Sequence, residues 1–235
     1  MPGMSADGAK PSFRRRLYSS RARWERRGGT GGFGARSMPA WNKGQIIGQK
    51  LPLKPKEVWG IRTRLEVASN LRELALFNVA IDSKLRACDL TCVKVQDLTI
   101  SGMFRSRATV IQKKTGRPVQ FEISEQAKNS LDKWISFRKL LPADFLFPSQ
   151  KSAKPHLSTR QYGRIVNRWV VSLGLDRRRY GTHSLRRTKV SQIYKKTGNL
   201  RAVQLLLGHT KLESTVRYLG IEVDDALAMS EQVDL

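Results

Sequence analysis

Apolar residues recur at helical spacing through most of this chain, and the period changes toward two in one stretch, residues 98–123. Within that stretch, alternating apolar residues flank a basic tip at residues 113–117, with the sequence KKTGR. This arrangement predicts a β-hairpin whose basic tip is exposed. The whole pattern therefore predicts an α+β fold that is mainly helical, with a small antiparallel β-sheet or hairpin on one edge.

Helix start and stop signals divide the rest of the globular part. The predicted helices begin near Pro55, Leu71 and Leu85, and at the N-caps Ser124, Ser158, Thr182 and Asn199. In the helix after Ser158, apolar residues recur every three or four positions, which indicates a face in the core and not a surface on which bases stack. That stripe consists of Tyr162, Ile165, Val166, Trp169, Val170 and Leu173.

The N-terminal part of the chain has a different composition. The first forty residues hold seven of the 18 glycines and eight arginines, with almost no aliphatic residues. Such a segment cannot bury enough apolar surface to offset the entropy lost on ordering. We interpret residues 1–50 either as a flexible basic arm that follows a DNA backbone or as an upstream extension of a protein whose translation starts at Met38. Residues 51–235 are expected to form one domain.

The net charge restricts the partners of the chain. Its 44 Lys and Arg against 19 Asp and Glu give a formal charge of +25 and a pI of about 10.9. A polyanionic partner is expected, because each neutralised phosphate releases condensed counterions. A ribosomal or membrane-surface protein would share this charge, but the composition favours DNA or RNA, and no segment resembles a known RNA-binding module. We expect a cytoplasmic, nucleoid-associated protein, from bacteria, without a membrane partner.

The two cysteines are four residues apart. On a helix, Cys88 and Cys92 would share one face and could form half of a metal site. No second pair of Cys or His lies nearby in the sequence, so we expect both to pack in the core. A framework of disulfide bonds is not expected.

Several polar residues lie at predicted helix starts and ends, where a phosphate can bind. His183 and Arg186 are three residues apart, on the same face of a first helical turn, where free N–H groups and the helix dipole favour an anion. For this pair alone, a surface His and Arg is the simpler interpretation. However, Gly208-His209 follows Arg186 after 23 residues, and Tyr218 follows His209 after nine.

Three segments in this order resemble the tyrosine recombinases, or phage integrases. They are residues 182–187 (THSLRR), 206–210 (LLGHT) and 214–218 (STVRY). Each is weak alone, and the ordered set is specific. The resemblance runs from about Leu51 to the C-terminus and implies the fold of the family's catalytic domain.

Two further motifs lie upstream. Residues 85–90 (LRACDL) resemble the context of the family's first arginine, which makes Arg86 the candidate; Asp89 stands where the family most often has Glu. The family also has a lysine on a β-hairpin. Lys114 at the hairpin tip fits this position, and Lys113 is the alternative.

The resemblance implies a transfer of a DNA phosphodiester without metal, ATP or another cofactor. The implied catalytic residues are Arg86, Lys114, His183, Arg186, His209 and Tyr218. The two arginines would bind the non-bridging oxygens of the phosphate with permanently charged planar groups. The hairpin lysine would protonate the departing 5′ oxygen.

The remaining residues would serve the nucleophile. Tyr218 would attack the phosphate and become joined to a DNA 3′ end, and His183 would deprotonate or position its phenol. His209 would add a hydrogen bond to the phosphate. A phenol titrates near 10, so the surrounding cations would also activate it.

The resemblance further implies a homo-multimer, from dimer to tetramer, on paired sites in double-stranded DNA. Most members carry a separate helical domain before the catalytic one, and here only the basic arm precedes it, a layout similar to the small fimbrial invertases. The alternatives are an inactive DNA-binding accessory factor of a mobile element and a type IB topoisomerase. The intact set of residues argues against the first, and residues 209–218 look more like a recombinase. Residues 219–235 are expected to form an amphipathic helix that docks on a neighbouring subunit or on its own domain.

Overall fold

A computed structural model describes residues 49–150, 154–221 and Glu231 of the chain. Nearly all of the basic arm predicted for residues 1–50, and nearly all of the amphipathic tail predicted after Tyr218, lie outside the described residues. The helices are α1 (Pro55–Val67), α2 (Leu71–Ser83), α3 (Ala87–Leu90), α4 (Val95–Leu98), α5 (Glu125–Arg138), α6 (Thr159–Ser172), α7 (Thr182–Thr197), α8 (Leu200–Leu207) and α9 (Leu212–Leu219). The strands are β1 (Thr99–Ile100), β2 (Met103–Phe104), β3 (Arg107–Ile111) and β4 (Pro118–Glu122).

The predicted hairpin is confirmed. Strands β3 and β4 pair antiparallel, with Ala108 opposite Phe121 and Val110 opposite Val119. Ala108, Val119 and Phe121 are buried, while residues 113–118 at the tip are exposed. A second, shorter hairpin of β1 and β2 lies within the same stretch of changed period. The fold is therefore mainly helical with small antiparallel sheets, as the periodicity predicts.

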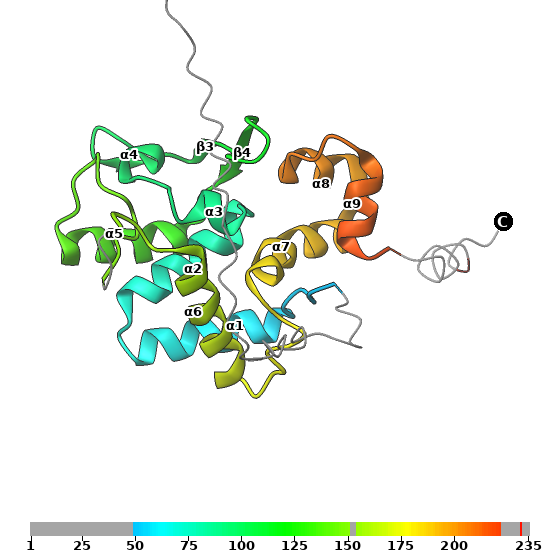
Figure 1. Ribbon diagram of the computed structural model, residues 1–235, viewed down its shortest axis with the longest axis horizontal. Coiled ribbons are helices and arrows are strands. Elements are labelled where there is room, and N and C mark those ends of the chain that lie inside the picture. The colour runs from blue at the N-terminus through cyan, green and yellow to red at the C-terminus, as the bar shows by residue number, and fades with distance from the viewer. Residues whose placement is uncertain (1–48, 151–153, 222–230, 232–235) are drawn as a thin grey trace, which may run out of the picture. The chain divides into compact units, whose positions relative to one another are not determined.

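Helix α2 forms the centre of the main hydrophobic core. Ala75, Leu76 and Phe77 are fully buried, because α1, α5, α7 and β4 all contact this helix (Figure 1). A helix that is surrounded in this way needs apolar residues on every side. The ring of Trp169 meets that of Phe77 edge-on, with centroids 5.3 Å apart, which joins the predicted apolar stripe of α6 to the same core.

Ion pairs connect the end of α2 and the following Lys84 to β4 and α7. Lys84, which is 1% exposed, pairs with Glu122 at 3.1 Å. Lys189 on α7 pairs with Asp82 at 2.7 Å and with Glu122 at 2.5 Å. Burial alone would raise the pKa of Glu122, but the hydrogen bond from Lys189 and the charge of Lys84 lower that pKa to about 2. These pairs hold the end of β4 and the middle of α7 at a fixed separation.

Two predicted helix starts are corrected. The third helix begins at Ala87 and not near Leu85, because Lys84 has a left-handed backbone (φ 56°) and Arg86 is extended. The result is a single turn with Arg86 as its N-cap. The N-cap of α7 is Gly181, so Thr182 is its first helical residue.

The prediction that both cysteines pack in the core is wrong. Cys88 and Cys92 are only partly buried, and Cys92 lies beyond the end of α3. The thiol of Cys92 accepts a hydrogen bond from Lys113 Nζ at 2.8 Å and lies 3.4 Å from His156 Nε2. Cys92 therefore contacts the hairpin through Lys113.

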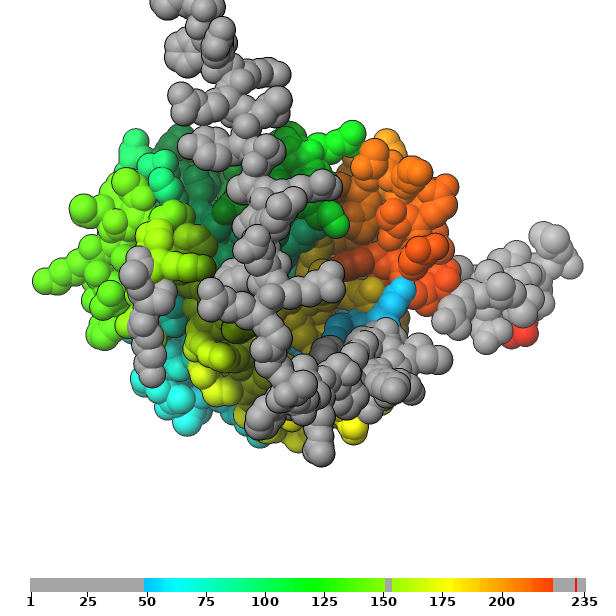
Figure 2. Space-filling model, viewed as in Figure 1, coloured from blue at the N-terminus to red at the C-terminus, as the bar shows by residue number. Residues whose placement is uncertain are grey.

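A second, smaller hydrophobic cluster joins α7 to α8 and α9. Val190, Val203 and Leu207 are its fully buried members. Helix α8 also contacts β4, and the green hairpin and the orange α8–α9 segment reach the surface beside each other (Figure 2). Between α8 and α9, Gly208 has a left-handed backbone (φ 65°), and a Cβ on it would lie 2.7 Å from Val119 Cγ2. Only glycine allows this close approach.

None of the helices described is long and apolar enough to cross a membrane.

Candidate active site

A cavity of about 530 Å³ lies beside the loop between α8 and α9. Five separate parts of the chain supply its walls: the start of α3, the hairpin tip, the first turns of α7, the α8–α9 loop and helix α9. The lining residues are Arg86, Thr115, His183, Arg186, Gly208, His209, Thr210, Lys211, Ser214 and Tyr218. The structure thus brings together five of the six residues that the sequence singles out. Lys114 does not line the cavity and is exposed at the hairpin tip.

Arg186 is the most deeply buried charge in the cavity. It is 2% exposed, and its Nη2 donates to the carbonyl oxygen of Leu207 at 2.7 Å. Its Nε and Nη1 are buried and have no hydrogen-bond partner among the described residues. Burial lowers the pKa of this guanidinium, and the neighbouring Arg86 lowers it further. Buried donors without partners are costly, so this position is suited to an anion with oxygen acceptors.

Arg86 approaches the same cavity from the N-cap of α3. Its Nη1 donates to the side-chain oxygen of Gln112. Asp89, one turn along, is 2% exposed and accepts the backbone N–H of Lys113 at 2.9 Å. The carboxylate of the arginine motif therefore holds the backbone of the hairpin next to the arginine.

Sequence reasoning missed Gln112. It appears in the sequence as one more position of an alternating strand, yet it is 1% exposed and bonds to both sides of the cavity. The available signal is a polar residue on the apolar side of the hairpin, where an unpaired amide would be costly.

Tyr218 lies in the last turn of α9 with its hydroxyl buried. That hydroxyl has no hydrogen bond of good geometry among the described residues. The guanidinium carbons of Arg187 and Arg186 lie 4.5 Å and 5.7 Å from the ring centroid, and the ring of His209 meets it edge-on at 5.3 Å. Burial raises the pKa of the phenol, while the charges of Arg186 and Arg187 act to lower it.

The pKa values of both histidines in the cavity are lowered, which favours the neutral imidazole. Loss of hydration lowers the pKa of His183, and so do the charges of Arg186 and Arg187. Loss of hydration and the charge of Arg186 lower the pKa of His209 to about 4, and its Nδ1 lies 3.2 Å from Thr215 Oγ1. A neutral imidazole has one nitrogen free to accept a proton at neutral pH.

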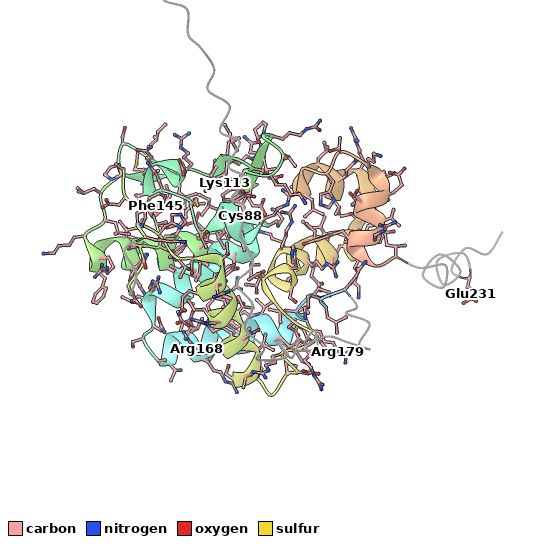
Figure 3. All side chains as sticks on the ribbon, in the orientation of Figure 1. Cys88, Lys113, Phe145, Arg168, Arg179 and Glu231 are labelled. Carbon is pink, nitrogen blue, oxygen red and sulfur yellow. The ribbon has the colours of Figure 1, made fainter. Side chains whose placement is uncertain are left out.

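The two hairpin lysines differ in their contacts. The Nζ of Lys113 is bound to Cys92, beside the α3 segment that carries the labelled Cys88 (Figure 3). Lys114 is exposed, and its neighbour Thr115 lines the cavity.

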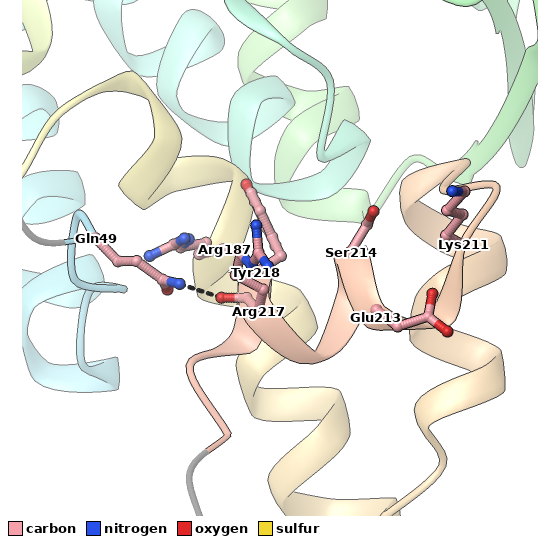
Figure 4. A pocket seen from close by; sticks show the side chains of 7 residues that line it. All are labelled: Gln49, Arg187, Lys211, Glu213, Ser214, Arg217 and Tyr218. Atoms are coloured by element: carbon pink, nitrogen blue, oxygen red, sulfur yellow. Dashed lines mark hydrogen bonds between the residues drawn. The ribbon is translucent and has the colours of Figure 1, made fainter.

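A second cavity of about 630 Å³ adjoins the first, and Tyr218 lines both. Its other walls are Gln49, Arg187, Lys211, Glu213, Ser214 and Arg217. Tyr218 and Arg187 lie side by side in the close view, and Gln49 donates to the backbone oxygen of Arg217 (Figure 4). The described part of the chain has no group of three His, Cys, Asp or Glu that could bind a metal ion, and the first cavity is lined by cationic and neutral groups. Its chemistry is that of an anion site.

Comparison with known proteins agrees with this geometry. The model of the phage integrase family matches residues 53–223, so the chain belongs to the phage integrase family. Among curated proteins, it is 29% identical over 159 residues to a probable integrase/recombinase, YoeC, of Bacillus subtilis, covering 68% of this chain and 83% of that protein. It is 32% identical over 152 residues to a tyrosine recombinase of Pseudothermotoga lettingae, covering 65% of this chain and 50% of that protein.

A solved structure supports the fold. The Tn1549 transposon integrase in complex with transposon right end DNA superposes with a TM-score of 0.65 at 17% identity, over 80% of this chain and 67% of that one. The fold is that of a tyrosine recombinase catalytic domain. The chain spans about half the length of most of the curated relatives that it matches.

Proposed function

We propose that this chain is a site-specific DNA recombinase that cuts and rejoins strands through a 3′-phosphotyrosine intermediate. The observation that carries the proposal is the environment of Arg186, which lines the cavity together with Arg86 and Tyr218 and has two buried donors without a hydrogen-bond partner among the described residues. A phosphodiester supplies the oxygen acceptors that these donors lack. Membership of the phage integrase family supports the same reaction.

In the proposed reaction, the Tyr218 oxygen attacks the scissile phosphorus, and the bond from phosphorus to the 5′ oxygen breaks. The phenol proton passes to neutral His183, and Lys114 donates a proton to the departing 5′ oxygen. Arg86 and Arg186 stabilise the charge on the non-bridging oxygens. The transfer is reversible, because the bond energy is kept in the phosphotyrosine until a second 5′ hydroxyl attacks.

His209 would donate a hydrogen bond to the same phosphate. Its Nδ1 contact with Thr215 leaves Nε2 as the nitrogen for the phosphate. No metal ion or organic cofactor enters this scheme, since the two arginines supply the charge stabilisation that a metal supplies in other phosphoryl transfers.

Double-stranded DNA is the proposed partner, with a homo-multimer of two to four chains on paired sites. The charge of +25 supports a polyanion, and the Tn1549 integrase was solved with DNA. We assign catalysis to residues 51–235 and propose that residues 1–50 add contacts to the DNA backbone. The site of action would be the bacterial nucleoid.

The experiment traps the intermediate on nicked suicide DNA from the chain's own genetic neighbourhood, without metal. After cleavage, the short fragment that carries the new 5′ hydroxyl diffuses away, and the protein stays joined to the 3′ phosphate of the other fragment. We expect an adduct on a denaturing gel with the wild-type chain and none with Tyr218→Phe, which should bind the same DNA with nearly unchanged affinity. An adduct with Tyr218→Phe would show that another residue is the nucleophile. DNA binding without any adduct would favour an inactive accessory factor.

A further inference from the structure

We propose that Gln112 is a positioning residue that fixes the guanidiniums of Arg86 and Arg186 relative to each other and to the hairpin tip. The proposal rests on the proposed function for its meaning, since the two arginines are taken to bind one phosphate. It concerns a residue that touches neither the phosphate nor the nucleophile in the proposed reaction.

The side chain of Gln112 makes three hydrogen bonds in a buried site. It is 1% exposed, and its Oε1 accepts from Arg86 Nη1 and from Thr115 Oγ1, the latter at 2.9 Å. Its Nε2 donates to the carbonyl oxygen of Leu207 at 3.2 Å. One amide therefore connects the first arginine, the hairpin tip and the C-terminus of α8.

The carbonyl oxygen of Leu207 completes the connection. It also accepts Nη2 of Arg186 at 2.7 Å. The bonded series thus runs from Arg86 through Gln112 and the Leu207 carbonyl to Arg186, and it joins α3 to α7 by way of the hairpin. An amide is suited to this place because it carries an acceptor and a donor on the same end group. Glutamate would lack the donor, and methionine would lack both.

The backbone of Gln112 sets the hairpin tip as well. Its N–H donates to the Arg117 carbonyl at 2.9 Å, and its carbonyl accepts the Gly116 N–H at 2.8 Å. These bonds close the loop that carries Lys114. Since misplacement of catalytic groups by about 1 Å costs roughly a hundredfold in rate, a residue that places Arg86 and the loop of Lys114 relative to Arg186 should control the chemical step.

The test compares two variants in which an apolar side chain replaces a buried, hydrogen-bonded amide, one beside the cavity and one elsewhere. Gln112→Met keeps the length of the side chain and removes its hydrogen bonds. Asn78→Leu is the matched control: Asn78 is also 1% exposed, and its Oδ1 accepts from Arg62 Nε at 2.8 Å while its Nδ2 donates to Ser130 Oγ at 3.0 Å. Both variants break a bond between a buried amide and an arginine, but Asn78 does not line the cavity and has no bond to a residue that lines it.

The measurements are the rate of adduct formation on saturating suicide DNA, the DNA dissociation constant and the melting temperature. We expect Gln112→Met to lower the rate by about ten- to a hundredfold, the effect of losing one hydrogen bond to a charged group, with DNA affinity within about twofold of wild type. Asn78→Leu should lower the melting temperature and leave the rate of the folded protein near wild type. Equal rates for both variants at temperatures where both are folded would overturn the proposal.

A crystal structure of Gln112→Met separates this inference from the proposed function. If Gln112 positions Arg86, that guanidinium should leave its wild-type place in the variant while Arg186 keeps its bond to Leu207. An unmoved Arg86 would refute the positioning role whatever the activity. If the wild-type chain forms no adduct, the proposed function fails, and the structure of the variant alone decides the role of Gln112.

Discussion

The guanidinium carbon of Arg187 lies 4.5 Å from the centre of the Tyr218 ring, nearer than that of Arg186 at 5.7 Å. Arg187 is 8% exposed, and its Nη1 donates to the backbone oxygen of Lys50 at 2.6 Å. A segment before α1 therefore holds a second cation against the proposed nucleophile. A cation at this distance favours the phenolate over the phenol.

Replacing Arg187 should shift the pH dependence of cleavage. The charge of Arg187 lowers the pKa of Tyr218, so Arg187→Met should raise that pKa and move the rise of adduct formation to higher pH. At neutral pH we expect a rate about tenfold lower, the effect of losing about 1.4 kcal/mol of electrostatic stabilisation of the phenolate relative to the phenol. The measurement is the rate of adduct formation from about pH 6 to about pH 10, in steps of roughly one pH unit, which approaches the ordinary pKa of a phenol.

Arg178→Met is the matched control for this prediction. Arg178 is exposed and pairs with Asp176 at 3.3 Å, away from both cavities. Its profile should coincide with that of wild type. A profile for Arg187→Met with unchanged midpoint, only scaled down, would mean that Arg187 supports the fold and does not activate Tyr218.

Local patterns in the sequence explain which parts of the structure could be predicted. Alternation predicted the hairpin of β3 and β4, and helical spacing placed His183 and Arg186 on one face of the first turns of α7. The third helix was predicted to begin too early, because its start depends on the left-handed backbone of Lys84, a residue that burial and Glu122 fix from other elements. The spacing of residues within one helix depends on neighbouring positions in the sequence, whereas the backbone conformation of Lys84 depends on contacts with distant elements.

The same distinction applies to the site. The ordered motifs named five residues that the structure brings to one cavity. They gave no role to Gln112 or to Arg187, although Arg187 lies within the quoted segment 182–187. The Leu207 partner of Gln112 lies 95 residues away, and the Lys50 partner of Arg187 lies 137 residues away. The first contact arises only when the hairpin and α8 are assembled, and the second only when α7 meets the segment before α1, so no periodicity records them.

Gly208 should tolerate substitution less well than another helix-ending glycine. Gly208 and Gly198 both have left-handed backbones, at φ 65° and 63°, but a Cβ on Gly208 would lie 2.7 Å from Val119 Cγ2, whereas Gly198 has nothing within 4 Å. Gly198→Ala should cost about 1 kcal/mol from backbone strain alone. Gly208→Ala should cost about 1–3 kcal/mol more, because the hairpin must move. Urea denaturation followed by circular dichroism measures both, and equal losses would contradict the close approach.

Acid should destabilise the fold in two steps. The pKa of His209 is about 4 in the folded chain against an ordinary value of 6.5, so the unfolded chain binds more protons between these values. Stability is therefore complete above about pH 6.5 and falls as the pH drops toward 4. For Glu122, with a pKa of about 2 against 4.5, the loss follows from pH 4.5 downward.

Two variants separate these steps in melting temperatures recorded across this pH range. His209→Gln, which keeps an acceptor for the Thr215 hydroxyl, should reduce the upper step, to which His183 also contributes, and leave the lower one. Glu122→Gln should do the reverse. A wild-type curve without loss between pH 6.5 and 4 would contradict the low pKa of His209.

The two hairpin lysines should respond differently to a change of leaving group. Lys114 is exposed at the tip, whereas Lys113 Nζ is bound to Cys92 at 2.8 Å and its backbone N–H to Asp89. If Lys114 protonates the 5′ oxygen, Lys114→Ala should lower adduct formation by about a hundredfold or more, a usual contribution of a general acid. On DNA with sulfur in place of that oxygen, the variant should recover nearly the wild-type rate, because a thiolate leaves without a proton. Lys113→Ala should show a smaller loss and no recovery, since its effect would come from a displaced hairpin; recovery of Lys113→Ala alone would instead assign the proton to Lys113.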